Sequence, residues 1–435
     1  MLEKNNSRLI NAWASFDWSN SVYNLIVTTA IFPIYYLSTT ENAFGGETVQ
    51  FFGLTVVNSV LYSYAIAFSF LVIVFLAPVL SGIADFSGRK KRFMQFFTYL
   101  GALACIGLYF FTGENVEYGI TCAVLASVGF AGSLVFYNAF LPEVASEDKM
   151  DRVSARGFAM GYIGSVILLI INLVLYMKSD LFGFKDGGAA TRFGFILVGA
   201  WWLGFSQIAF YYLEDRATGK KITFDILGNG IRELKKVYAV VREKTVMMRF
   251  LTAFFIYSMG VQTVMLLAPL FGDKEVGMTA DEMIFVVLIL QIVAIAGAYF
   301  FALVSKFRGN GFAISTTLII WIFICITGYF LKDKMSFYGL AGLLGFVMGG
   351  VQSISRSTYS KLIPEGTKNT ASFFSFYDIS EKLAIVIGSF SYGFIDQITG
   401  SMRNSMVFMA LFFIGGFVIL QFARLKKNLK PLAEG

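Results

Sequence analysis

Three charged side chains lie close together inside an apolar stretch late in the chain, where ionised groups are costly. Asp378, Glu381 and Lys382 follow Tyr377 within the stretch 372–395. A carboxylate or ammonium at the centre of a bilayer costs about 2.5–3.5 kcal/mol. Asp378 and Lys382 are four residues apart, so they can meet on one helix face and neutralise each other. Protonation of one carboxylate would break an ion pair, which is the chemistry of a gate or an ion-coupling site. The alternative is a solvated or structural group at the cytoplasmic mouth.

Another carboxylate, Asp17, lies in an apolar stretch near the start of the chain. On a helix with about 3.6 residues per turn, Asp17, Asn20, Ser21 and Asn24 fall on one side. This side should face protein or water rather than lipid, so the stretch predicts a bundle with a polar interior. Asp17 is the preferred coupling carboxylate. Because it lies in the first two turns, the alternative is that it holds Trp13 and a cytoplasmic gate in place.

The stretches that must position these groups are long and apolar. The chain has 435 residues, of which 57% are hydrophobic and 14% are charged. Apolar runs of about 20 residues, the length that crosses a bilayer core, recur to its end. Within lipid such a span must be a helix, because its backbone groups have no water to bind. The sequence therefore predicts an all-α polytopic membrane protein. The expected spans are roughly 12–38, 59–83, 93–112, 117–141, 157–178, 192–213, 248–271, 282–304, 312–331, 336–357, 372–395 and 404–424.

The charged residues outside the spans indicate an orientation and exclude some functions. Most of the 35 Lys and Arg residues fall in loops on the side shared by both termini, which the positive-inside rule places in the cytoplasm. The net charge of +7 is spread over these loops, so no nucleic-acid partner is expected. The chain has no histidine, so proton coupling must use carboxylates. Its three cysteines lie inside apolar runs without metal-binding spacing, and we expect no metal and no cofactor.

The long segment Glu214–Met247 divides the spans into six plus six. The predicted domains are therefore a bundle over 1–213, a cytoplasmic linker over 214–247 and a bundle over 248–435. Within the linker, apolar residues recur at helical spacing and predict an amphipathic helix on the cytoplasmic surface, or else a solvated linker. These apolar residues are Leu227, Ile231, Leu234, Tyr238 and Val241. Leu-Pro-Glu follows the fourth span and Ile-Pro-Glu the tenth, which supports duplicated halves.

One loop between spans carries a recognisable motif. Residues 81–92, SGIADFSGRKKR, resemble the signature loop of the major facilitator superfamily, G-x-x-x-D-x-x-G-R-R/K, with Ser81 in place of the first glycine. In that family the loop holds the two halves together in the outward-open state. The resemblance implies this role for Asp85 and Arg89. The equivalent loop of the second half, Ser305–Gly311, is degenerate.

Three further blocks narrow the resemblance. Residues 16–23, FDWSNSVY, resemble the opening YDWANSAY of the unknown major facilitator group, which is similar to vacuolar amino-acid effluxers associated with autophagy. The other blocks are 137–143 with 154–158, and 352–357 with 374–378. The resemblance implies twelve transmembrane helices in two pseudo-symmetric six-helix bundles around a central cavity. It also implies transport by alternating access, with an amino acid as substrate and export as direction.

By the same resemblance, the first, fourth, seventh and tenth spans line the cavity. These spans carry amide, phenol and guanidinium groups that can bind a zwitterion or a polyol by hydrogen bonds. Arg356 could hold a carboxylate through two bonds. Amides also join membrane helices to each other, which is the alternative role for each residue. The candidate substrate-binding residues are Asn20, Tyr23, Asn24, Tyr137, Asn138, Tyr257, Gln262, Gln352 and Arg356. The candidate ion-coupling or gating residues are Asp17, Asp85, Arg89, Asp378, Glu381 and Lys382.

Together these observations predict a secondary active transporter of a small polar solute, coupled to an ion gradient that is most simply H⁺. The expected partners are the solute, the coupling ion and the lipid bilayer. The expected state is a monomer in the cell (inner) membrane with both termini cytoplasmic. Without a G-x-x-x-x-G-K-[ST] loop, a gradient must supply the energy. Peptides, nucleosides and sugar derivatives are alternative solutes.

Two alternatives from other classes are a sensor that binds solute without moving it, and a polytopic membrane enzyme such as a lipid-linked group transferase. The enzyme would need an acid, base or metal group near one interface. Its candidate acids are Asp85, Glu143, Glu147, Asp148 and Asp151. They are interleaved with basic residues, and no Asp-x-Asp or His-rich motif accompanies them, so we expect no catalytic residue and no enzyme.

Overall fold

The computed structural model describes residues 3–216 and 226–425. Its contacts divide the chain into two compact units, and the division does not follow chain order alone. The first unit contains Ser7–Asn138 and Met160–Ile231. The second contains Glu3–Asn6, Ala139–Ala159 and the residues from Arg232 onward. The segment Ala139–Ala159 therefore makes its contacts with helices of the second half, although in sequence it joins two spans of the first half.

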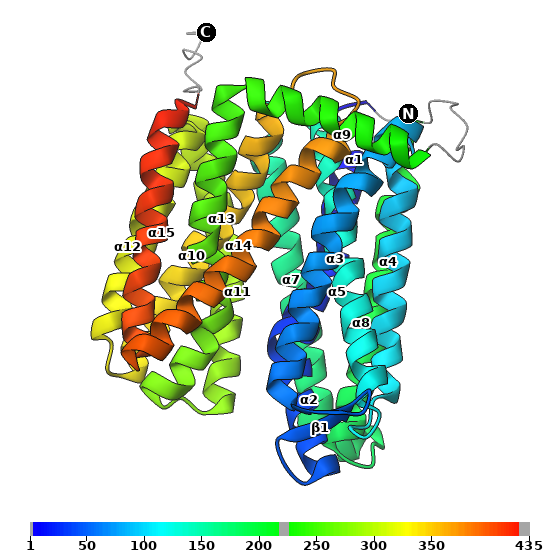
Figure 1. The fold of residues 1–435 in the computed structure, drawn as a ribbon, viewed down its shortest axis with the longest axis vertical. Helices are drawn as coiled ribbons and strands as arrows, with labels where there is room; N and C mark the ends of the chain where they lie inside the picture. Colours follow the sequence, from blue (N-terminus) through cyan, green and yellow to red (C-terminus); the bar gives the residue numbers. More distant parts are fainter. Residues whose placement is uncertain (1–2, 217–225, 426–435) are drawn as a thin grey trace. The chain divides into compact units, whose positions relative to one another are not determined.

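The first unit is helical apart from one hairpin (Figure 1). Its elements are α1 (Ser7–Val22), η1 (Tyr23–Ala30), α2 (Phe32–Phe44), β1 (Thr48–Phe51), β2 (Leu54–Val57), α3 (Asn58–Ser87), α4 (Lys90–Gly107), η2 (Leu108–Phe110), α5 (Val116–Ala139), most of α7 (Met150–Met177), η3 (Ser179–Phe182) and α8 (Gly187–Tyr212). Within this unit α8 packs against both α1 and α4.

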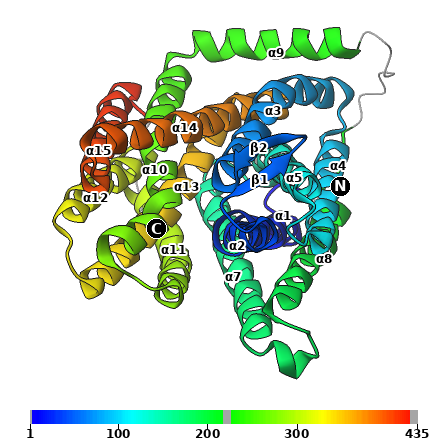
Figure 2. The ribbon, with the colours of Figure 1, turned by 60° about the horizontal axis from the view of Figure 1, so that its bottom comes forward.

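The hairpin is the one exception to the predicted all-α content in the described residues. It follows the first span, and its strands β1 and β2 pair antiparallel, with Thr48 opposite Val57 and Phe51 opposite Leu54 (Figure 2). Phe52 and Gly53 form the turn with φ of 46° and 81°. Two consecutive positive φ angles are typical of the type I′ turns that join two-residue hairpins.

The second unit is built from the remaining helices. They are α6 (Leu141–Val144), the start of α7, α9 (Ile226–Glu243) from Arg232 onward, α10 (Thr245–Val276), α11 (Ala280–Arg308), α12 (Asn310–Phe330), α13 (Lys334–Leu362), α14 (Thr370–Thr399) and α15 (Met402–Ala423). Within this unit α10 packs against α14 and α15, α11 against α13, and α12 against α15.

Local sequence signals explain where several of these helices begin and end. Thr279 and Glu282 form a capping box at the start of α11: Thr279 N donates to Glu282 Oε2 at 2.8 Å. Asp333 begins α13 by accepting from Ser336 N at 2.9 Å. The turn after α3 contains Gly88 with φ of 67°, a left-handed conformation that glycine adopts without a steric cost.

The first span differs from the single helix predicted over 12–38. It is α1 continued by the π-helix η1, in which Ile31 N donates to Ile26 O at 2.9 Å, and it bends by 42° before α2. Pro33 lies at the start of α2 and has no N–H to continue the helical ladder. The predicted span is therefore bent, and the proline explains where the break falls.

Twelve long segments account for the predicted spans in the described part of the chain. Ten helices are long and apolar enough to cross a membrane, and the bent pair Ser7–Ala30 with Phe32–Phe44 counts as an eleventh if it is one span. The twelfth is α14, with 30 residues. At 1.5 Å per residue it is roughly 45 Å long, more than a bilayer core requires. Its interior carries the charged residues Asp378, Glu381 and Lys382, which reduce its apolar content.

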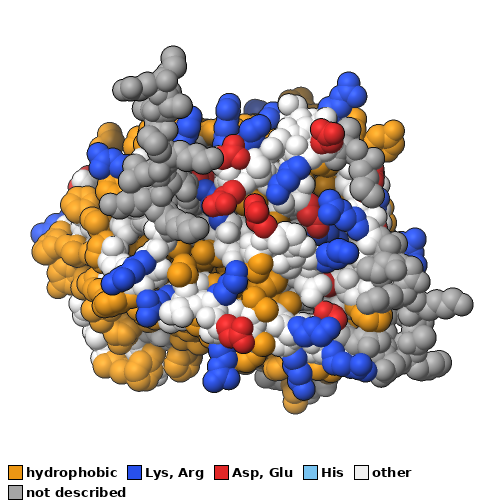
Figure 3. Space-filling view, turned by 90° about the horizontal axis from the view of Figure 1, so that it is seen from above, with side chains coloured by type: hydrophobic (Ala, Val, Ile, Leu, Met, Phe, Trp, Pro, Cys, Tyr) orange, Lys and Arg blue, Asp and Glu red, His pale blue; other side chains and the backbone are white. Residues whose placement is uncertain are grey.

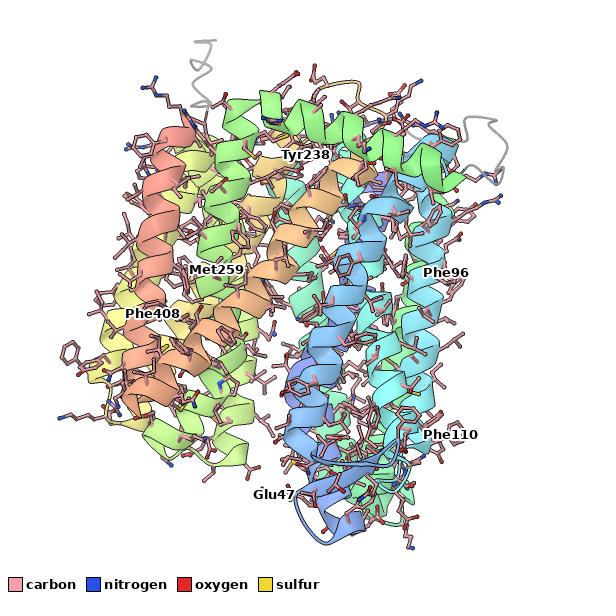
Figure 4. The ribbon with its side chains drawn as sticks, in the orientation of Figure 1. Glu47, Phe96, Phe110, Tyr238, Met259 and Phe408 are labelled. Carbon is pink, nitrogen blue, oxygen red and sulfur yellow. The ribbon has the colours of Figure 1, made fainter. Side chains whose placement is uncertain are left out.

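The apolar outer surface of the helices fits a lipid environment. Phe96 and Phe110 of the first unit are 60% and 62% exposed and project away from their helices (Figure 4). Such side chains are costly in water but not against lipid tails. The fold is therefore the predicted all-α membrane protein, with the hairpin as a small addition outside the spans.

The predicted amphipathic helix of the linker is present as α9. The rest of the linker, 217–225, and the side chain of Leu227 lie outside the described residues, as do both chain termini. The division at 1–213, 214–247 and 248–435 and the cytoplasmic location of the termini stay predictions.

Candidate functional site

In the second unit a carboxylate, an ammonium and an amide meet within the spans. Gln262 Nε2 donates to Glu381 Oε1 at 3.1 Å, and Lys382 Nζ lies 2.8 Å from Glu381 Oε2. Glu381 is roughly 16 Å along α14 from its first residue, and Gln262 is roughly 25 Å along α10, so both lie deep within their helices. The side chain of Lys382 is 7% exposed and that of Glu381 is 20% exposed. The Glu381 carboxylate therefore neutralises the buried Lys382 ammonium, while the Glu381 side chain itself stays partly exposed.

Aromatic and hydroxyl groups make further contacts among α10, α13 and α14 in the same unit. Tyr257 OH and Ser355 Oγ are 2.7 Å apart, which joins α10 to α13. Tyr377 stacks on Phe254 with ring centroids 4.1 Å apart, and it is followed by the buried Asp378. The predicted pairing of Asp378 with Lys382 stays a prediction, since the ion pair that defines the cluster is Glu381 with Lys382.

Gln352, a candidate solute ligand of α13, also contacts α10. Its Nε2 lies 3.8 Å from Met265 Sδ, a weak acceptor, and its side chain is only partly buried. Its predicted role in solute binding stays a prediction.

Arg356 binds the first turns of α7. Its Nε donates to Ser154 Oγ at 3.0 Å, its Nη2 donates to Ser154 O at 2.9 Å, and its guanidinium lies 4.1 Å from the centre of the Phe158 ring. Ser154 Oγ in turn donates to Ser353 O at 2.7 Å. A planar guanidinium satisfies such a forked arrangement better than an ammonium would. In this structure Arg356 joins helices, and its predicted contact with a solute carboxylate stays a prediction.

Sequence reasoning missed a buried, multiply hydrogen-bonded carboxylate of the second unit. Asp151, at the start of α7, accepts from Ser305 Oγ at 2.8 Å, from Asn310 Nδ2 at 2.8 Å and from Lys361 Nζ at 2.6 Å. Asn310 also donates to Thr358 Oγ1 at 2.8 Å. The side chains of Asp151 and Lys361 are 7% and 9% exposed. This is a buried ion pair whose carboxylate has donors on both oxygens, as such a pair requires.

A signal for this cluster was present in the sequence. The loop Ser305–Gly311 has neither the aspartate nor the full cationic run of the signature motif, so it resembles a degenerate copy. Its polar residues Ser305 and Asn310 are the ones that bind Asp151. The arrangement also bears on the enzyme alternative, because three donors already occupy the Asp151 carboxylate. In the described residues no group of three or more acidic or cysteine side chains could hold a metal ion.

In the first unit, Asp17 contacts the fourth span. Tyr137 OH donates to Asp17 Oδ2 at 2.7 Å, and Trp13 Nε1 donates to Tyr137 O at 3.1 Å. The rings of Trp13 and Tyr137 are stacked with centroids 4.5 Å apart. Asp17 is only 5% exposed. This geometry matches the alternative in which Asp17 holds Trp13 and its surroundings in place, and its coupling role stays a prediction.

The remaining candidates of the first unit differ in exposure. Tyr23 is buried between the rings of Phe130 and Trp202, with centroids at 5.1 and 5.6 Å. Asn138 is also buried. Asn20 is 1% exposed, and its Nδ2 has no hydrogen-bond partner among the described residues.

Asn24 is different, because its side chain is exposed on η1 in the middle of the first span. An exposed amide at this depth is unfavourable against lipid, so Asn24 must face protein or water.

The signature loop lies at the end of α3, as predicted. Asp85 is buried, and Arg89 N donates to Ala84 O at 3.0 Å across the Gly88 turn. The next helix begins where Lys91 N donates to Asp215 Oδ1 at 2.7 Å, and burial raises the pKa of the Asp215 carboxyl above its usual range. The loop is thus ordered by its own unit, and the role of Asp85 and Arg89 in holding two halves together stays a prediction.

Sequence comparisons identify a family over nearly the whole chain. A family model described as "Vacuole effluxer Atg22 like" matches residues 5–431. An uncharacterized MFS-type transporter of Bacillus subtilis, YxiO, is 31% identical over 415 residues, covering 95% of this chain and 94% of the relative. Autophagy-related protein 22 of Yarrowia lipolytica is 24% identical, covering 88% of this chain and 79% of the relative.

Solved structures show the same fold at low identity. FucP in the outward conformation matches with a TM-score of 0.69 at 14% identity, over 96% of this chain and 99% of FucP. The human organic anion transporter MFSD10 matches with a TM-score of 0.69 at 14% identity, over 95% of this chain and 99% of that chain. These likenesses assign the fold of twelve helices in two six-helix bundles. The chain belongs to the Atg22-like vacuole effluxer family and is an integral membrane transporter of the major facilitator superfamily.

Proposed function

We propose that this transporter exports an amino acid by alternating access, driven by the entry of H⁺. The family name, vacuole effluxer, supports efflux of a solute, and the amide and hydroxyl groups within the spans suit a zwitterion. The two bundles, 1–213 and 248–435, rock about a midplane site in this proposal. The transporter acts as a monomer in the cell membrane with both termini in the cytoplasm.

The observation that carries the coupling proposal is the position of Glu381. It accepts hydrogen bonds from Gln262 and Lys382 deep within the spans, and its side chain is 20% exposed. A proton that reaches Glu381 removes the negative charge beside Lys382 and releases the amide of Gln262. A buried ammonium without its partner is unfavourable, so proton binding favours a rearrangement of α10 and α14. Glu381 is therefore the coupling carboxylate that we favour over Asp17.

The test is uptake by proteoliposomes under an imposed pH gradient, with a pool of radiolabelled amino acids. We expect at least one amino acid to accumulate only when the gradient is present. Glu381→Gln keeps the hydrogen-bond shape but cannot ionise, so it should exchange the amino acid without concentrating it. Glu282→Gln is the matched control, because Glu282 pairs with Lys334 at the start of α11, where the side chains are 30% and 42% exposed.

Each other outcome removes a defined part of the proposal. If no amino acid moves, the substrate is wrong, and peptides, nucleosides and sugar derivatives should be screened with the same protein. If Glu381→Gln concentrates the solute as well as the wild type, Glu381 does not couple, and Asp17→Asn becomes the next variant. Accumulation that ignores the pH gradient would exclude H⁺ as the coupling ion.

A further inference from the structure

Helix α9 carries a row of side chains that stay exposed among the described residues. Ile231, Lys235, Tyr238 and Arg242 are spaced four, three and four residues apart, so they follow one side of the helix. Ile231 is 42% exposed and Tyr238 is 49% exposed, and both basic residues are exposed. We call these four residues the outer row. It alternates apolar or amphipathic groups with cations.

The neighbouring side of α9 fixes the helix in place. Val237 and Val241 are each 2% exposed. Asn369 Nδ2 donates to Glu233 Oε2 at 2.9 Å, which joins α9 to the start of α14. The rings of Tyr238 and Phe376 of α14 have their centroids 6.1 Å apart. Tyr238, labelled in Figure 4, stays half exposed. The outer row is therefore held in a fixed position and does not belong to a freely moving linker.

The place of α9 in the chain puts the outer row at the membrane surface. Only Lys244 separates α9 from α10, which is a candidate span, and α9 runs across the end of that span (Figure 1). Lys and Arg side chains appear beside acidic and apolar ones in the view of Figure 3. Tyrosine at a membrane interface and cations that reach phosphate groups are typical of surface-lying helices. The charge of the row is complementary to an anionic leaflet.

We propose that the outer row is a binding site for the head groups of anionic phospholipids. Lys235 and Arg242 donate hydrogen bonds to lipid phosphate oxygens. The guanidinium of Arg242 can donate two parallel bonds, whereas the ammonium of Lys235 acts as a compact positive charge. The two cations are seven residues apart, roughly 10 Å along the helix, so each can hold a separate head group. Ile231 and Tyr238 lie at the boundary with the acyl chains. The proposal does not depend on which solute is transported.

The same helix provides a control with equal charge. Arg232 and Lys236 lie away from the outer row, and Lys236 Nζ is bound to Glu233 Oε1 at 2.8 Å. Removing these two cations changes the net charge of α9 by the same amount as removing Lys235 and Arg242. A difference in lipid binding between the two double variants therefore depends on the outer row and not on the overall charge.

The experiment measures phosphatidylglycerol binding to the full-length, detergent-solubilised protein by native mass spectrometry, with phosphatidylcholine as the neutral probe. The wild type should prefer phosphatidylglycerol. The variant Lys235→Gln/Arg242→Gln should lose affinity for it by roughly fivefold per charge, the effect of one cation near an anionic surface. The variant Arg232→Gln/Lys236→Gln should bind as the wild type does. Higher salt should weaken phosphatidylglycerol binding only by the wild type and by this control variant.

Two results would overturn the proposal. One is equal phosphatidylglycerol binding by the wild type and Lys235→Gln/Arg242→Gln. The other is an equal loss in both double variants, which would mean that charge alone attracts the lipid without a site. A circular dichroism spectrum and a thermal unfolding curve for each variant separate these results from a failure to fold.

Discussion

At the scale of single residues, a hydrogen bond from Tyr137 bears on the role of Asp17. Its carboxylate accepts from Tyr137 OH at 2.7 Å in a buried setting where Trp13 stacks on the same phenol ring. A hydrogen bond to an ionised group is worth about 1.5–3 kcal/mol, more than a neutral one. Asp17 therefore positions the fourth span against the first, whether or not it also binds a proton.

Replacing Tyr137 by phenylalanine should lower the free energy of unfolding by about 1.5–3 kcal/mol, because a buried carboxylate loses a donor. The measurement is unfolding in mixed detergent micelles, with Asp17→Asn and the double variant completing a cycle. Tyr118→Phe is the control, since Tyr118 OH donates to Gly107 O at an exposed position and its loss should cost less. Strictly additive effects of Tyr137→Phe and Asp17→Asn would show that the bond contributes nothing.

At the scale of helices, glycines decide how closely α11 and α13 approach. A Cβ atom on Gly349 would lie 2.0 Å from Ala294 O, and one on Gly345 would lie 2.5 Å from Leu290 O. These neighbours are backbone atoms of α11, so they cannot move aside as a flexible side chain could. The spacing of Gly345 and Gly349 is the small-xxx-small pattern by which membrane helices pack closely.

Gly349→Ala should therefore destabilise the protein by about 1–3 kcal/mol, the usual effect of an inserted methyl group in a packed interface. Gly339→Ala on the same helix is the matched control, because nothing lies within 4 Å of the added methyl. It should be neutral or stabilising by up to about 1 kcal/mol, since alanine favours a helix more than glycine. Equal unfolding curves for the two variants would contradict the close approach.

At the scale of the whole molecule, the important feature is the membership of α7 in both units. Its first turns make their contacts with α11, α12 and α13, and its remainder belongs to the first unit. Asp151 with Lys361 and Arg356 with Ser154 are the strongest of these contacts. Any motion of one half against the other must therefore either break this cluster or carry the start of α7 along.

Asp151→Asn should cost about 3–5 kcal/mol of stability, because it leaves the buried Lys361 ammonium without a charge partner. The double variant Asp151→Leu/Lys361→Met removes both charges and should cost less than the single change. Glu282→Gln weakens the partly exposed pair with Lys334 and should cost much less than Asp151→Asn. The measurement is again unfolding in mixed micelles, and a single variant as stable as the Glu282→Gln control would argue against a buried pair.

Much of this protein was determined by its sequence alone. The length of the apolar stretches predicts the helices, because a span must cross the bilayer core and must pair its backbone groups internally. The polar side of the first span, the signature loop after α3 and the amphipathic pattern of α9 are local features, and local features are readable one segment at a time.

Contacts between distant segments were decided only by the tertiary structure. The spacing of Asp378 and Lys382 predicts a pair and does not indicate that Lys382 also binds Glu381, whose carboxylate accepts from Gln262 on another helix. Asp151 looked like one acid among several, and its partners come from positions 305, 310 and 361. Pro33 marks the place of the break in the first span, but the local sequence does not specify how far the span bends there. The spacing of polar residues predicts which side of a helix is polar. Which residues those side chains contact depends on how the helices pack.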